Sequence, residues 1–101
     1  MDPRTRRVSV GLLQLEFRLR LARSLKDKRS AVSRLQRLRS NHNVSVAEVD
    51  AQDDLRRLVV AIGMVGNDRR RLESQLDQIA DKVDGMHIAE LVSRQVTVET
   101  L

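Results

Sequence analysis

The chain has 101 residues, of which 41% are hydrophobic and 33% charged, with a formal net charge of +5 and no Cys. This length fits one domain and leaves little for a second. The lack of Cys excludes disulfides, thiolate zinc sites and Cys nucleophiles, and we expect a cytoplasmic protein. No apolar run approaches the ~20 residues that cross a bilayer, and the charged N-terminus is unlike a signal peptide.

The charge is unevenly distributed along the chain. Residues 1–41 carry 12 Lys and Arg against 3 Asp and Glu, whereas residues 42–101 carry 7 against 11. If the first strand and the first helix share a surface, that surface is positive and attracts phosphate backbones. Either this face is simply solvated, or it binds nucleic acid or a nucleoprotein particle; a membrane surface is the weakest alternative.

The first predicted element is a strand over residues 8–21, "VSVGLLQLEFRLRL". Apolar and polar side chains alternate there with period two, which indicates one buried face. Val8, Val10 and Leu12 fall in the opposite phase. We therefore expect a bulge or a change of buried face near Gly11.

The spacing of apolar residues then predicts a helix over residues 24–41, stopped by "NHN" at 41–43. Lys28 lies inside the apolar arc of this helix, where its ammonium must snorkel or reach a partner. Glu48 and Asp50, at the end of the next strand, are the acids that we consider as partners.

The rest of the chain alternates strand, strand, helix and strand. A polar turn joins two strands into a hairpin, and the second of them is apolar on both faces, as in a central strand. Gly85 is expected to end the following helix. These elements span residues 43–49, 55–65, 67–84 and 87–98.

The order of elements predicts an α+β protein with a ferredoxin-like βαββαβ sandwich, in which a four-stranded antiparallel sheet carries two helices on one face. The first and third strands should be central and the other two should be edges. We expect residues 1–7 to form a flexible tail and residues 8–101 to form the single domain.

Three motifs carry a resemblance to a known family. They are "SLKDKRS" at 24–30, "NVSVAEVD" at 43–50 with "QDD" at 52–54, and "VGNDRRRLE" at 65–73. Together they resemble the YlxP-like family of small bacterial proteins of unknown function. The resemblance implies a ferredoxin-like fold, a cytoplasmic setting and no established enzymatic activity. Family members are often encoded near translation and ribosome-maturation factors, which implies an association with RNA or the ribosome.

The start of the first helix is a candidate anion site. Its free N–H groups and dipole, with Lys26, Lys28 and Arg29 nearby, suit a phosphate. Alternatively, Ser24 and Asp27 form a structural cap that already satisfies those donors.

RNA binding would have to use phosphates, because the only aromatic residue, Phe17, belongs to the core phase and cannot stack bases. Such binding is weakly sequence-specific and strongly dependent on salt. The candidate nucleic-acid-binding residues are Arg18, Arg20, Lys26, Lys28, Arg29, Arg34 and Arg37.

The third strand also suggests a different partner. Val59, Ala61, Gly63 and Val65 share one face, and the helices cover only one side of the sheet. An uncovered apolar strip invites a second copy of the chain, so we also consider a homodimer.

No pattern in the chain indicates an enzyme. It has no glycine-rich phosphate loop, nucleophile elbow or metal-ligand spacing, so we expect no catalytic, metal-binding or cofactor-binding residues and no small-molecule substrate. The acids Asp50, Asp53 and Asp54 fit a solvated turn, and "RRR" at 69–71 forms a secondary basic patch. His42 fits a helix C-cap, and His87 is expected to begin a strand.

The function that we expect is a non-catalytic RNA- or ribosome-associated accessory factor that binds phosphates through its first helix. The alternative is a homo-oligomeric structural or protein-interaction module with no nucleic-acid role, in which the positive helix only maintains solubility.

Overall fold

The computed structural model describes residues 8–101, and the expected flexible tail at 1–7 lies outside the described residues. In chain order the elements are strand β1 (Ser9–Arg18), helix α1 (Leu25–Gln36), 3-10 helix η1 (Arg37–Ser40), strands β2 (Ser45–Asp50) and β3 (Arg57–Gly66), helix α2 (Arg69–Gly85) and strand β4 (Glu90–Thr100). The βαββαβ order is as the sequence predicts.

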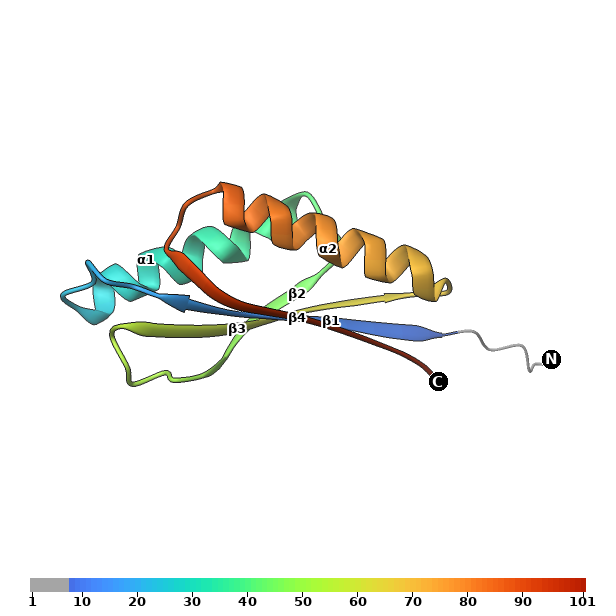
Figure 1. The fold of residues 1–101 in the computed structure, drawn as a ribbon, viewed down its shortest axis with the longest axis horizontal. Helices are drawn as coiled ribbons and strands as arrows, with labels where there is room; N and C mark the ends of the chain where they lie inside the picture. The colour runs from blue at the N-terminus through green and yellow to red at the C-terminus, as the bar shows by residue number, and fades with distance from the viewer. Residues whose placement is uncertain (1–7) are drawn as a thin grey trace.

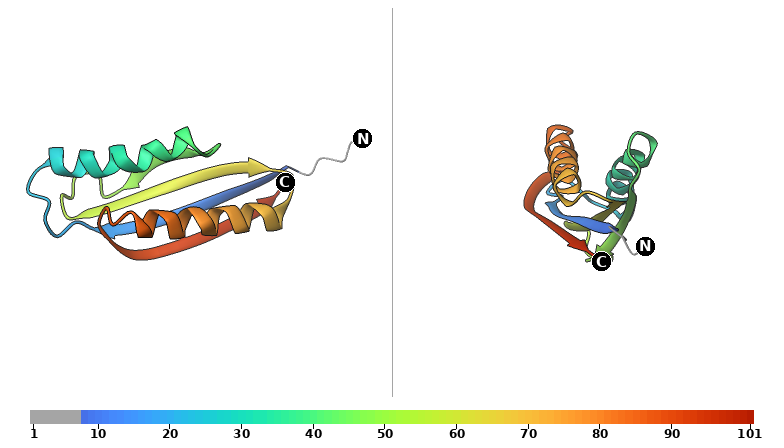
Figure 2. Two further views of the ribbon diagram at one scale, coloured as in Figure 1. Left: turned by 90° about the horizontal axis from the view of Figure 1, so that it is seen from above. Right: turned by 90° about the vertical axis from the view of Figure 1, so that its right-hand side faces the viewer.

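The four strands form one antiparallel sheet in the order β2-β3-β1-β4, so β1 and β3 are central and β2 and β4 are edges, as expected. Both helices lie on the same face of the sheet (Figure 1, Figure 2). α2 packs over β1 and β4, whereas α1 lies on the β2 side. The α+β sandwich is confirmed. We call the face of the sheet that neither helix covers the open face.

The core fills the space between the sheet and the helices. Leu13, Leu15 and Phe17 of β1 are at most 1% exposed and point toward the helices, whereas the residues between them are on the open face. Leu76 and Ile79 of α2 close over them. Each such side chain contributes about 1.5–3 kcal/mol by leaving water, which makes this alternation the main determinant of the buried face.

The bulge expected near Gly11 is absent, because β1 pairs with β3 in unbroken register from Ser9 to Arg18. The register shifts instead in the edge strands, opposite Glu16–Phe17 and between Glu48 and Asp50. The helix-facing positions at the start of β1 are held by small residues under α2, and the apolar side chains of Val10 and Leu12 lie on the open face. The buried face is therefore the same along the whole of β1, and neither the bulge nor the change of buried face occurs: Ser9 and Gly11 take the buried positions before Leu13.

Residue 11 is a glycine at the point where α2 lies close to β1. A Cβ atom added at Gly11 would lie 2.6 Å from Leu76 Cδ1, closer than two carbon atoms pack. A side chain at this position would require Leu76, which is fully buried, to change its rotamer, or α2 to move.

The element ends differ from the sequence-based boundaries at several points, and β1 ends at Arg18 rather than at residue 21. α1 ends at Gln36, and the chain continues as η1 to Ser40. His87 does not begin a strand: it lies in the turn before β4 with φ of 51°. Gly85 is the last residue of α2 and has no positive φ, so the left-handed residue that reverses the chain is His87.

Lys28 connects α1 to the β2–β3 hairpin from inside the protein. Its residue is 2% exposed, and Nζ lies 2.9 Å from Glu48 Oε2, which confirms one of the two acids considered as its partner. This contact is an ion pair without hydrogen-bond geometry, since Nζ donates to backbone carbonyls of the hairpin loop. These acceptors are the oxygens of Ala51, Gln52 and Asp54, the last at 2.7 Å.

Replacing Lys28 with Met should lower the free energy of unfolding by about 3 kcal/mol, because the change leaves an unpaired buried carboxylate oxygen and carbonyls without a donor. Urea unfolding measures this loss. Lys26→Met, the same change on the exposed side of α1, is the matched control and should stay within about 0.5 kcal/mol of the wild type. Equal effects of the two variants would contradict the role of Lys28.

Gly11→Ala should lower the free energy of unfolding by about 1–3 kcal/mol, since the buried Leu76 must leave its packed rotamer, or α2 must shift, to admit the methyl group. Gly63→Ala is the control, because a Cβ there would lie at an ordinary 3.6 Å from Leu12 Cδ2. We expect Gly63→Ala to be neutral or slightly stabilising. Thermal unfolding of both variants measures these effects. A Gly11→Ala variant as stable as the wild type would show that a glycine is not required at this position.

Candidate nucleic-acid interface

The outer surface of the first helical segment carries Lys26, Arg29 and Arg37, which we call the basic face. The helix buries Lys28, Ala31 and Leu35 on one arc, so residues at the opposite angles of the helical wheel point to solvent. All three basic side chains are exposed, and within residues 8–101 none of them forms an ion pair. Their charges are therefore available to an anion.

The two helices differ in charge. From Leu25 to Ser40, α1 and η1 carry six Lys and Arg and a single acid, whereas α2 carries four basic and four acidic residues. The positive charge on the helical side of the molecule thus gathers on α1, and the "RRR" patch at 69–71 belongs to a helix whose charges balance.

The start of α1 is capped by the chain itself. Ser24 Oγ accepts the N–H of Asp27 at 3.3 Å, and Asp27 Oδ2 accepts the N–H of Arg23 at 2.9 Å. A carboxylate therefore stands where a phosphate would bind, and it repels a second anion. Of the two interpretations of this segment, the structural cap is the one present.

Lys28 lies apart from the other candidate residues. Its buried ammonium is held by Glu48 and the loop carbonyls. Reaching a phosphate would require breaking those contacts and exposing the core. We leave Lys28 out of the basic face for this reason.

Arg18, Arg20 and Arg34 meet around a hollow of about 700 Å³ at one end of the sandwich, between the end of β1, α1 and the loop before β4. Its floor is apolar, with Leu19 and Ala31 among the lining residues. The three cations therefore do not continue the basic face but surround a separate depression.

The charges around this hollow are partly neutralised. Arg20 Nε donates to Glu90 Oε1 at 2.7 Å, which lowers the pKa of Glu90 and raises the pKa of Arg20. Arg34 donates to the carbonyl of Met86 at 3.3 Å and stays exposed. Of these three cations, Arg34 lies on α1 and flanks the basic face.

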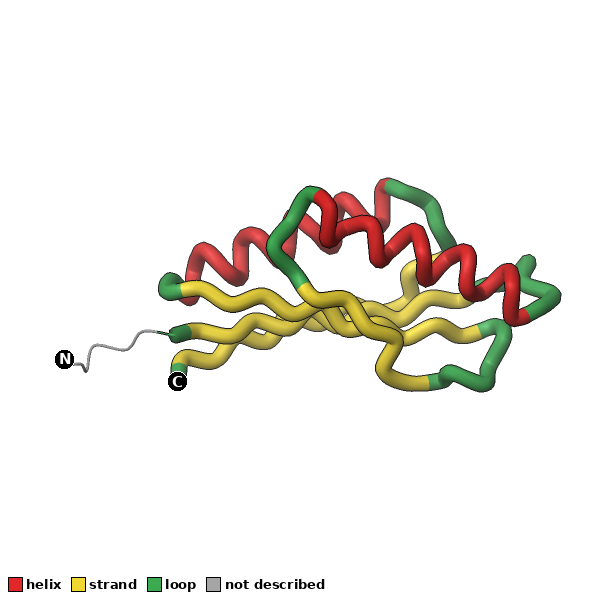
Figure 3. The backbone as a smooth tube through the Cα atoms, turned by 180° about the vertical axis from the view of Figure 1, so that it is seen from behind, coloured by secondary structure: helices red, strands yellow, loops and turns green. Residues whose placement is uncertain are grey.

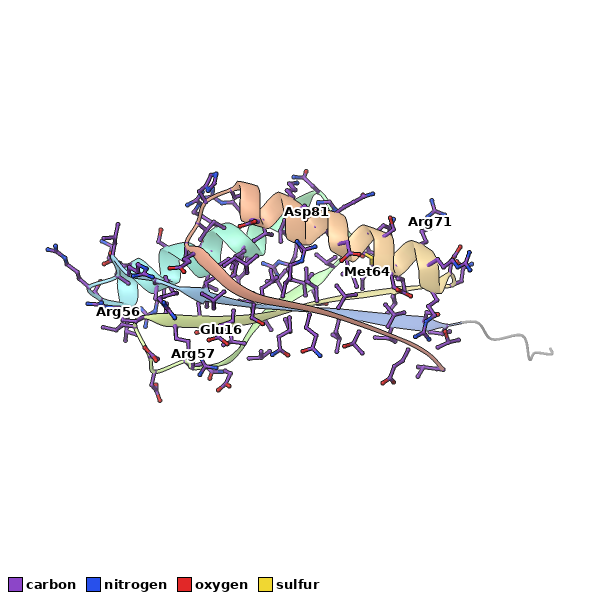
Figure 4. The ribbon with its side chains drawn as sticks, viewed as in Figure 1. Glu16, Arg56, Arg57, Met64, Arg71 and Asp81 are labelled. Carbon is purple, nitrogen blue, oxygen red and sulfur yellow. The ribbon has the colours of Figure 1, made fainter. Side chains whose placement is uncertain are left out.

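The first strand and the first helix share only this hollow and do not form a joint positive front. Arg18, the last residue of β1, lines the hollow but alternates with the core residues and is paired with Arg57 on the open face. There, Arg57 Nε donates to Glu16 Oε2 at 2.7 Å and lowers the pKa of that carboxyl group. Figure 4 shows Glu16 and Arg57 on the side of the sheet away from the helices.

Sequence reasoning missed the polar neighbours of the basic face. Ser33, Arg37, Arg39 and Ser40 line a shallow hollow of about 410 Å³ at the end of α1. Hydroxyl and guanidinium groups together are common phosphate contacts. The pattern in the sequence that indicates this hollow is the recurrence of Ser at helical spacing between the basic residues of the first helical segment.

The hairpin acids and the histidines have local roles. Asp50 Oδ1 accepts the N–H of Ala51, and Asp54 Oδ1 accepts the N–H of Arg56, each at 2.8 Å. His42 Nε2 lies 3.4 Å from the ammonium of Lys82, between the two helices. Among residues 8–101 no three His, Asp or Glu side chains are grouped to hold a metal ion. No helix in this range is long and apolar enough to cross a membrane.

Comparison with known proteins places the chain in a family. No curated protein matches it. A family model described as "Protein of unknown function (DUF503)" matches residues 10–96 and so covers all seven elements in whole or in large part. The chain therefore belongs to the DUF503 family of proteins of unknown function.

Proposed function

We propose that this protein is a non-catalytic, cytoplasmic accessory factor that binds RNA or a ribosomal particle through its basic face. The observation that carries the proposal is the set of three exposed cations, Lys26, Arg29 and Arg37, without an ion-pair partner among residues 8–101. Arg39 extends the same surface at its end, and Arg34 lies at its flank, on the rim of the separate hollow. The resemblance to the YlxP-like family supports the same partner.

The contacts are to phosphates rather than to bases. Phe17, the only aromatic side chain, is 1% exposed and cannot stack on a base. Lys and Arg on a convex helix surface neutralise backbone charge, and the Ser hydroxyls between them donate to phosphate oxygens. Binding is therefore weakly selective for sequence, and each phosphate contact adds to its dependence on salt.

The alternative role, a homo-oligomeric module without nucleic acid, uses a different part of the molecule. The basic face lies on the helical side, whereas the predicted apolar strip of β3 lies on the open face, where Val65 is exposed but Val59 is only 3% exposed. Self-association is therefore compatible with RNA binding, so a dimer alone does not favour the alternative role. The alternative role requires in addition that the protein does not bind RNA.

The triple variant Lys26→Glu, Arg29→Glu and Arg37→Glu should weaken binding to ribosomal RNA at least about tenfold, because three phosphate contacts become repulsive. The slope of log K against log salt should fall by about 2, since each contact to a single strand contributes roughly 0.7. Filter binding over a series of salt concentrations measures both quantities.

The matched control is Arg69→Glu, Arg70→Glu and Arg71→Glu, which changes the net charge equally but on α2. Acidic residues are favourable in the first turn of a helix, so this variant should fold. It should retain most of the affinity for RNA. Equal losses in the two triple variants would show that only net charge matters, and a wild-type protein that fails to bind RNA would refute the proposal.

A further inference from the structure

We propose that the open face is a self-association surface, on which a second copy of this chain packs sheet against sheet. The feature that carries this inference is an apolar and uncharged centre on a surface that no helix covers (Figure 3). The inference is independent of RNA binding, because the basic face lies on the opposite side of the sheet.

The centre of the open face is built from β1 and β3. Cross-strand partners share a face, and the register pairs Val10 with Val65, Leu12 with Gly63 and Gln14 with Ala61. Leu12 is 48% exposed and Val65 is 63% exposed, although both lie within regular strands. Leu12 lies in the middle of the open face and Val65 lies near the end of β3, and adjoining exposed apolar side chains on a sheet indicate a contact surface.

The edge strands continue the uncharged centre. β4 adds Gln95 beside Gln14 and Thr97 beside Leu12, and β2 adds Ser45 beside Gly63 and Ala47 beside Ala61. In a chain with 33% charged residues, the rows of Leu12 and Gln14 carry none, and the Val10–Val65 row carries only Glu99, at the edge of the sheet. Depletion of charge in the centre, with charges at the border, is the composition of protein interfaces.

The border of the open face carries the charges. Arg57, Glu16 and Arg18 lie at one end of the sheet, and Glu99 lies at the other, beside Val10. Arg57 and Glu16 already neutralise one another. The open face as a whole therefore has little net charge, unlike the basic face.

A second copy fits this surface better than a nucleic acid or a charged partner. In a two-fold contact the same surface meets itself, so a charged centre would repel its own copy. The uncharged centre removes that repulsion for a chain whose net charge is +5. Its amide and hydroxyl groups both donate and accept hydrogen bonds, so each can pair with the same group in the other copy.

The area is sufficient for a specific but weak dimer. The four strands have 10, 6, 10 and 11 residues. At about 3.3 Å per residue and about 4.8 Å between strands, they form a face of roughly 600 Å². Two such faces bury at most about 1,200 Å², the lower limit of specific interfaces. We therefore expect a weak dimer, in the micromolar range or above.

Sedimentation equilibrium of nuclease-treated full-length protein, from about 1 μM to 1 mM, tests the proposal. We expect a monomer–dimer equilibrium that changes little between low and high salt, because the centre is uncharged. Leu12→Glu should weaken dimerisation at least about tenfold, since it places two like charges in the contact. Val65→Glu, at a more exposed site, should do the same and gives the answer if Leu12→Glu fails to fold.

The matched control is Leu21→Glu, which makes the same change at a 90% exposed Leu outside the sheet. Leu21→Glu should dimerise as the wild type does. A wild-type protein that stays monomeric over the whole range overturns the proposal. It is equally overturned if folded Leu12→Glu and Val65→Glu dimerise as tightly as Leu21→Glu.

Discussion

The structure depends on one buried cation. Lys28 stands among apolar residues of α1, and an ammonium in that position is tolerated only when its charge and its protons are all engaged. Glu48 supplies the charge, and the carbonyls of the hairpin loop accept the protons. Because α1 lies toward the edge strand β2 rather than across the centre of the sheet, this contact fixes the helix that carries the basic face.

The sheet separates two surfaces of opposite character. On the helical side, cations are concentrated on α1, whereas Arg94 of β4 forms surface ion pairs with Asp77 and Asp81 of α2, which neutralise its charge. On the open face the centre is uncharged. A polyanion and a second copy of the chain therefore have different places to bind, and neither surface needs the other in order to act.

The fold could be predicted from the sequence because periodicity determines which face is buried. The alternation from Leu13 onward, and the helical spacing in both helices, gave the correct elements and the correct order of strands. The exact ends could not be predicted in the same way. The turn at His87 depends on a single left-handed residue, and a His there is not a strong signal for that conformation.

The candidate site could be predicted only in part. Composition identified α1 as basic, but a list of Lys and Arg does not distinguish an exposed Lys26 from a buried Lys28 two residues later. That distinction comes from the arc on which each residue lies, and the sequence did raise Glu48 as a partner. The positions of Arg18 and Arg20 could not be inferred from charge. That of Arg18 depends on the face of β1 on which it lies, and that of Arg20 depends on Glu90, an acid 70 residues away.

The left-handed backbone of Ala51, with φ of 56°, has a mechanical consequence. A residue with a side chain does not prefer this conformation, and the carbonyl that follows it is one of those held by Lys28. The contacts with Lys28 of α1 thus hold the hairpin loop in a strained backbone conformation. If α1 moved away from β2 beyond hydrogen-bond reach, Ala51 would be free to return to a common backbone conformation, so the shape of the loop depends on the position of the helix.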